Sequence, residues 1–180
     1  MANSLRIDVK HSVFGRAKET YSMSIKIIAA AAAATLLTAG VAAACPNYNL
    51  MGDNYSMSGS YLYSARSLSV RAGGRYSIDE CGIRPNTEQG RGYVTEKPDF
   101  SVRLSEMNRY SLVISVVSEC DSILLINTGA KNWYYDDDDN GSLDAQISLS
   151  RPSNGWMDIW VGTHNGTVCD ARLTLETFDS

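Results

Sequence analysis

The sequence is short of the residues that most catalytic sites need. It has two histidines in 180 residues, and only His164 lies beyond the first 44. No G-x-S-x-G motif is present, so the turn that presents the nucleophilic serine of many hydrolases is missing. Turn-forming residues flank His164 and favour an exposed loop. We therefore expect a non-catalytic protein, with a small secreted hydrolase that uses His164 as a minor alternative.

Clusters of basic residues are missing as well. The chain has 16 basic and 20 acidic residues, of which 5 and 2 precede residue 45, so the net charge of the remainder is −7. Binding to nucleic acid depends on neutralising phosphates, and binding to anionic lipid depends on basic residues. We expect neither a nucleic-acid partner nor stable membrane insertion after signal cleavage.

The first 44 residues predict a leader and a signal peptide. Lys26 precedes an apolar, alanine-rich run, and Ala42-Ala43-Ala44 has the small residues of a cleavage site. Met23 is the expected start of this signal, which makes residues 1–22 an upstream extension. The expected product is one domain, residues 45–180, exported to the periplasm or the medium.

All four cysteines lie in this predicted domain, at Cys45, Cys81, Cys120 and Cys169. An even number in an exported chain indicates two disulfides, and four cysteines allow three pairings. Cys45–Cys81 and Cys120–Cys169 are favoured because each pair closes one half of the domain. A metal site lacks the usual C-x-x-C or histidine spacing. Acylation of Cys45 after Ala42-Ala43-Ala44 is the remaining alternative.

No sustained 3.6-residue apolar period occurs in the predicted domain. Short alternating runs between Gly, Asn, Asp and Pro indicate strands instead. We therefore predict an all-β fold, a single antiparallel β-sandwich of jelly-roll-like form with two disulfides. Gly73-Gly74 predicts a hairpin turn, and residues 82–97 a surface loop. The expected strands lie within residues 68–70, 75–78, 100–104, 110–117, 123–126, 133–135, 147–149, 156–161 and 171–176.

An acidic segment, residues 136–144, resembles part of a calcium loop. Alternating oxygen-bearing side chains before a glycine can converge on one cation. Ile147 stands where such a loop has its bidentate glutamate, which predicts weak binding. The alternative is a solvated acidic turn without metal. The expected calcium ligands are Asp136, Asp138, Asn140, Ser142 and Asp144.

Three tryptophans are candidate ligand contacts. Trp133 precedes the acidic segment, while Trp156 and Trp160 are four residues apart and share one face of a strand. Tryptophans on an open sheet face can stack on sugar rings or anchor a protein partner. The alternative is that one of the pair belongs to the core and the other covers a sheet edge.

Residues 99–176 are similar to the bacterial pre-peptidase C-terminal domain, a small β-sandwich of secreted peptidases. The resemblance rests on Ser122-Ile123-Leu124-Leu125-Ile126-Asn127, on the acidic Asp136–Asp144 turn and on Gly155-Trp156-Met157-Asp158-Ile159-Trp160-Val161. Residues 45–98 and the cysteines depart from a minimal domain of that type. They look more like uncharacterised exported bacterial proteins that carry such a domain without a peptidase.

The resemblance implies an accessory or binding role. We expect a binding domain of the bacterial envelope or medium, with a polysaccharide or a protein as partner and possible calcium at the acidic segment. A structural or protein-interaction subunit without metal is the alternative.

Overall fold

The computed structural model describes residues 44–180. The predicted leader, signal peptide and start at Met23 lie outside these residues. Within the described part, no helix is long and apolar enough to cross a membrane.

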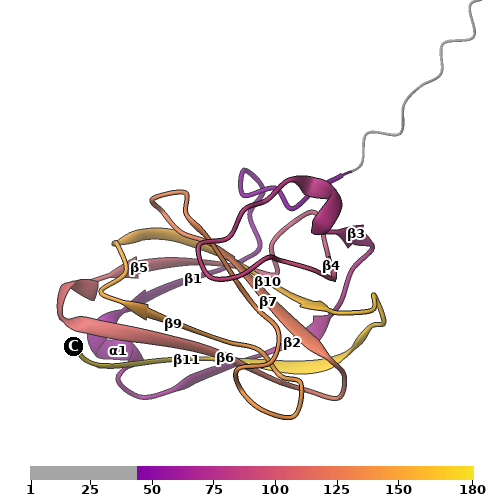
Figure 1. Ribbon diagram of the computed structural model, residues 1–180. Coiled ribbons are helices and arrows are strands. Elements are labelled where there is room, and N and C mark those ends of the chain that lie inside the picture. Colours follow the sequence, from indigo (N-terminus) through magenta and orange to yellow (C-terminus); the bar gives the residue numbers. More distant parts are fainter. Residues whose placement is uncertain (1–43) are drawn as a thin grey trace, which may run out of the picture. The chain divides into compact units, whose positions relative to one another are not determined.

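The described chain folds into two packed sheets (Figure 1). The larger one, sheet A, has seven strands: β1 (Asp53–Ser58), β3 (Tyr76–Ser77), β4 (Tyr93–Val94), β5 (Phe100–Ser105), β7 (Ser122–Asn127), β8 (Trp133–Asp136) and β10 (Gly155–Thr163). Sheet B has four: β2 (Arg66–Ala72), β6 (Tyr110–Ser118), β9 (Gln146–Ser150) and β11 (Cys169–Asp179). The helical turns are α1 (Gly59–Leu62), η1 (Asp79–Cys81) and η2 (Met107–Arg109). The predicted all-β sandwich is confirmed.

Both disulfides form with the favoured pairing. Cys45 is bonded to Cys81 with 5.5 Å between Cα atoms, and Cys120 to Cys169 with 6.2 Å. The first ties the N-terminal segment to η1, and the second joins the turn after β6 to the start of β11. The sulfur of Cys45 is therefore not free for acylation in this structure.

One strand pair departs from the antiparallel expectation, because β1 and β5 run parallel. The chain between them passes through α1 and through β2 in sheet B before it returns to sheet A. Parallel neighbours need a long crossover of this kind, whereas a short hairpin gives antiparallel ones. The local pattern of each strand carries no information about this route.

The predicted hairpin at Gly73-Gly74 is wrong. β2 pairs with β11 in sheet B, whereas β3 pairs with β4 in sheet A, so the glycines carry the chain between sheets. Gly73 has a φ of +118°, and a Cβ on Gly74 would lie 2.0 Å from the carbonyl carbon of Val94. Two glycines are needed here for a tight crossing rather than for a two-residue turn.

The main core lies between the two sheets and contains the inward side chains of β5, β6, β7, β10 and β11. A second core lies on the other face of sheet A. Leu124 and Ile126 belong to the main core, while Ile123 and Leu125 belong to the second, as alternation along a strand requires. Because both faces of β7 are covered, all six of its residues are buried.

Residues 82–92 cover this second core. Most of them are exposed, as expected of a surface loop, while Gly90 packs on Ile78 and Tyr135. The Thr87 hydroxyl accepts from the Tyr135 N–H (2.9 Å), and the Asn86 N–H donates to the Trp133 carbonyl (2.8 Å). The loop thus docks on the edge of β8.

Asp99 fills a gap in sheet A where β10 changes neighbours. β10 pairs with β5 up to Ile159 and with β4 at Thr163, which leaves Val161 without a strand partner on that side. The Val161 N–H donates to Oδ2 of Asp99 (2.8 Å), and its carbonyl accepts from the Gly73 N–H (3.0 Å). Burial raises the pKa of Asp99 to about 7, although the Val161 N–H and Lys97 oppose the rise and Asp53 adds to it.

This environment predicts that the protein loses stability as the pH rises from about 4 to about 7. The raised pKa means that the folded protein holds the proton of Asp99 more tightly than the unfolded chain does. The contribution of Asp99 to the free energy of unfolding is therefore largest below pH 4, falls across this window and then levels. The shift sets an upper bound of about 4 kcal/mol, which the partial exposure of Asp99 lowers.

Urea unfolding of the oxidised protein between pH 4 and pH 8 measures this dependence. Asp99→Asn keeps an acceptor for the Val161 N–H but cannot ionise, so its stability should vary less with pH than that of the parent. The exposed Asp179→Asn is the matched control and should keep the parental profile. Identical pH profiles for Asp99→Asn and the parent would contradict the assignment.

Candidate functional site

The acidic segment begins at Asp136, the last residue of β8, and the carboxylate of Asp136 is hydrogen-bonded to the backbone. Oδ2 of Asp136 accepts from the Asp139 N–H (3.1 Å) and the Gln146 N–H (2.7 Å). Asp136 is buried, and this burial raises its pKa, which the two N–H donors counteract. Asp136 thus closes the turn between β8 and β9.

Asp144 and Asn140 are also held by the protein. Oδ1 of Asp144 accepts from the hydroxyls of Ser118 (2.8 Å) and Ser122 (3.1 Å). The Asn140 amide donates to the Val116 carbonyl (2.6 Å). These bonds tie the far side of the loop to β6 and β7 in both sheets.

The other two expected ligands, Asp138 and Ser142, are exposed. Within residues 44–180 no group of three or more His, Cys, Asp or Glu side chains is arranged to hold a metal ion. Three of the five expected ligands are thus held by the protein, through Oδ2 of Asp136, Oδ1 of Asp144 and the amide NH2 of Asn140. The calcium site stays a prediction.

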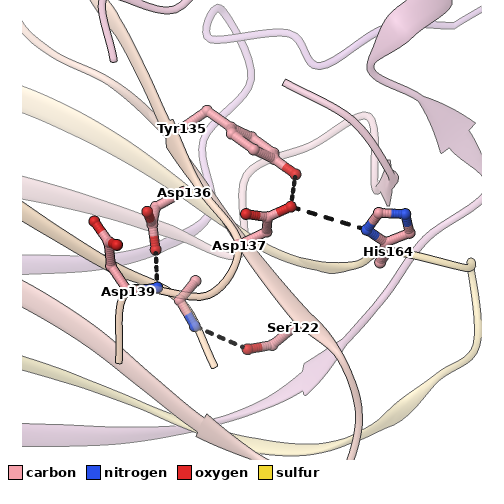
Figure 2. A network of polar contacts seen from close by, with 7 residues as sticks. Ser122, Tyr135, Asp136, Asp137, Asp139 and His164 are labelled. Carbon is pink, nitrogen blue, oxygen red and sulfur yellow. Dashed lines mark hydrogen bonds and ion pairs between the residues drawn. The ribbon is translucent and has the colours of Figure 1, made fainter. Parts of the chain in front are cut away.

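A second polar group surrounds Asp137, the carboxylate next to Asp136 (Figure 2). The Tyr135 hydroxyl donates to Oδ2 of Asp137 (3.4 Å), and Nδ1 of His164 lies 3.9 Å from the same oxygen. Tyr135 comes from β8, whereas His164 comes from the turn after β10. The structure therefore brings His164 to an acidic partner that its position in the sequence did not indicate.

This group does not assemble the machinery of a hydrolase. Burial, and then the charge of Asp137, raise the pKa of the Tyr135 hydroxyl above its usual value, which makes it a poor nucleophile at neutral pH. Nδ1 of His164 faces the carboxylate of Asp137 rather than a serine hydroxyl (Figure 2), and all four cysteines are in disulfides. His164 itself is half exposed, as its flanking turn residues predicted.

Carboxylates also gather in a pocket of about 420 Å³ between residues 87–88, β8 and β9. Glu88, Asp136, Asp138 and Asp139 line it. Burial raises the pKa of Glu88, and the neighbouring aspartates raise it further by repulsion. The pocket is a region of negative potential whose groups come from two separate parts of the chain.

The three tryptophans have different environments. Trp160 is completely buried, and its ring centroid lies 5.4 Å from that of Trp133. Trp133 also makes an edge contact with Tyr48 at 6.0 Å. Trp156 is 42% exposed. The second core therefore takes Trp160 out of reach of a ligand and leaves Trp156 as the most accessible of the three.

A buried polar row crosses the strands beside Trp156. Ser101, Asp158 and Asn127 are cross-strand neighbours on β5, β10 and β7. The Ser101 hydroxyl donates to Oδ1 of Asp158 (2.5 Å) and accepts from the Gly52 N–H (3.0 Å). Burial raises the pKa of Asp158. Within residues 44–180 the buried Nδ2 of Asn127 has no hydrogen-bond partner.

The sequence pattern did not single out this row. Asp158 stands two residues after Trp156 and shares its strand face, so its position resembled that of an ordinary solvent-facing residue. Arg103 stands directly opposite Trp156 on β5 and is exposed. The signal that could have found the group is the row of polar residues, Ser101, Arg103 and Ser105, that alternates with the apolar residues of β5.

Comparisons with known proteins leave the family open. No family model matches the chain, and no curated protein matches it. Among solved structures, PliG of Aeromonas hydrophila, a periplasmic lysozyme inhibitor of g-type lysozyme, aligns over 71% of this chain and 99% of its own. The identity is 9% and the TM-score is 0.38. A likeness this low carries no argument about fold or function.

The hydrogen bonds of Asp136 predict that it stabilises the fold whether or not metal binds. Asp136→Ala removes the acceptor of two backbone N–H groups and should lower the free energy of unfolding by about 1–3 kcal/mol. Asp138→Ala is the matched control because it also removes a carboxylate from the acidic segment but breaks no bond described here. Denaturant unfolding in EDTA measures both. Equal effects would contradict the framework role of Asp136.

The spacing of the acidic segment predicts a separate response to calcium. The thermal unfolding midpoint of the oxidised protein should rise by several degrees from EDTA to millimolar calcium, and Asp138→Ala should abolish the rise. Magnesium at the same concentration controls for ionic strength. Equal midpoints in EDTA and calcium would retire the metal site and leave Asp136–Asp144 as a hydrogen-bonded turn.

Proposed function

We propose that residues 45–180 are a non-catalytic binding domain of an exported bacterial protein. Two disulfides support export, because such bonds persist in oxidising compartments outside the cytoplasm. The surroundings of His164 support a non-catalytic role, because its nearest acidic partner, Asp137, is shared with a phenol of raised pKa. The resemblance to the pre-peptidase C-terminal domain is part of this proposal and gives the same accessory role.

The ligand surface that we propose is the part of sheet A around Trp156. The observation that carries it is the exposure of this one indole beside Arg103, while Trp133 and Trp160 pack together in the second core. An exposed indole offers a flat apolar face for the ring of a sugar. Arg103 adds five N–H donors at cross-strand distance, which fits hydroxyl or carboxylate groups on that ring.

A protein partner is the second candidate, and a different surface favours it. Tyr61, Tyr63 and Phe178 are all about half exposed around α1 and the end of β11. The Tyr63 hydroxyl donates to Asp179 (3.4 Å), and the Arg66 guanidinium lies 4.0 Å over the Tyr61 ring. Tyrosine and arginine are, with tryptophan, the residues enriched among those that dominate the binding energy of protein interfaces.

Two variants distinguish these surfaces. Trp156→Ala should reduce retention on insoluble polysaccharide by about tenfold, because a stacked indole contributes on the order of 1–2 kcal/mol. Phe178→Ala is the matched control, since Phe178 is 46% exposed but lies in sheet B. The measurement is depletion of the oxidised protein by peptidoglycan, chitin and cellulose.

The outcome of this assay decides the proposal. Retention that falls in Trp156→Ala and persists in Phe178→Ala supports a polysaccharide surface at Trp156. Retention on no polysaccharide, or equal retention of both variants and the parent, would overturn it. An unchanged unfolding midpoint of Trp156→Ala confirms that the variant is folded.

A further inference from the structure

A cleft of about 370 Å³ lies where β2 faces the starts of β1 and β5. It is distinct from the surface around Trp156, because neither Trp156 nor Arg103 lines the cleft. The apolar part of its lining includes Val70 and Phe100. The charged part consists of Asp53, Arg71, Lys97 and Asp99.

Asp99 is the fixed point of this cleft, because the backbone holds it on three sides. Its N–H donates to the Ile159 carbonyl (2.9 Å), and its carbonyl accepts from the Asp53 N–H (2.9 Å). Its Oδ2 accepts from the Val161 N–H (2.8 Å). Within the part of the chain that the structure describes, no hydrogen bond reaches Oδ1. One oxygen of a positioned carboxyl is thus left for a ligand.

The charges around Asp99 do not neutralise it. The Arg71 guanidinium is engaged by Asp170, with Nη1 and Oδ1 2.7 Å apart. Asp53 repels the Asp99 carboxylate, and Lys97 attracts it without forming an ion pair within 4 Å. Burial raises the pKa of Asp99 more than the Val161 N–H and Lys97 lower it, so this pKa is about 7. A shielded carboxylate normally has a cation as partner, and here the protein supplies none in direct contact.

We propose that this cleft binds small molecules that carry a primary ammonium group on an apolar stem. The ammonium donates to the free oxygen of Asp99, with Asp53 adding to the negative potential, and the stem lies on the partly exposed Val70. A metal ion is a poorer occupant, since the cleft offers two carboxylates and two cations.

Binding of this kind releases a proton. The ammonium is complementary to ionised Asp99 only, so the ligand must displace the proton that the empty cleft holds below pH 7. Affinity should rise about tenfold between pH 6 and pH 8, as the ionised fraction grows from about a tenth to about nine tenths. Among the described residues, the other charged groups that line the cleft are Asp53, Arg71 and Lys97.

The probe is n-butylamine, with n-butanol and butyrate as controls that keep the stem and replace the ammonium. Titrations of the oxidised, ¹⁵N-labelled protein follow the amide signals of Asp53, Asp99 and Val161 at pH 6 and pH 8. We expect saturable shifts with butylamine alone, about tenfold tighter at pH 8. Equal shifts with butanol would overturn the role of charge, and affinity independent of pH would overturn the role of Asp99.

Variants then assign the site. Asp99→Asn should lose saturable binding of butylamine, and Asp179→Asn, remote from the cleft, should keep it. Lys97→Met should tighten binding, because it removes a cation that attracts the Asp99 carboxylate. Unchanged binding in Asp99→Asn would overturn the proposal. If that variant does not fold, the pH dependence of the parent and the response of Lys97→Met still decide it.

Discussion

Strand β10 carries apolar side chains on both of its faces, and the covering of both faces organises the rest of the molecule. Met157, Ile159 and Val161 face sheet B, while Trp160 faces the opposite way. A sandwich covers only one face of each sheet. The second face of β10 must therefore be covered by the chain itself, since buried indole is favoured over exposed indole by the large apolar area it removes from water.

The N-terminal segment and residues 82–92 supply this cover, and the disulfide between Cys45 and Cys81 holds it. Neither segment contains regular strands long enough to add to a sheet. The bond closes a loop across 36 residues, which on chain-entropy grounds destabilises the unfolded state by about 4 kcal/mol. Glu96 completes the attachment, since its carbonyl accepts from the Asn47 N–H and the Trp160 indole.

The accessibility of the two tryptophans of β10 depends on how far this cover extends along the strand. It hides Trp160 and stops short of Trp156, so the two ends of one strand differ in accessibility. Where β10 leaves β5 and joins β4, Asp99 replaces a missing strand partner and opens into the cleft beside β2. Where β10 ends, His164 meets Asp137. Asp99 and His164 therefore both lie where the regular pairing of β10 is interrupted or ends.

The sequence by itself determined the local elements. Alternation in residues 100–104, 110–117 and 171–176 was enough to identify β5, β6 and β11, because the period of a strand is a local property. The exposed turn at His164 was also readable, whereas the sequence favoured one of three cysteine pairings without deciding between them. The sequence could not show that Gly73-Gly74 joins two sheets, that β1 runs parallel to β5, or that Asp136 and Asp144 are bound by backbone and hydroxyl donors. Only the tertiary structure decided these points, because each depends on contacts between residues that are far apart in the chain. The same reason explains why Trp156 and Trp160, equivalent in their strand pattern, have opposite environments.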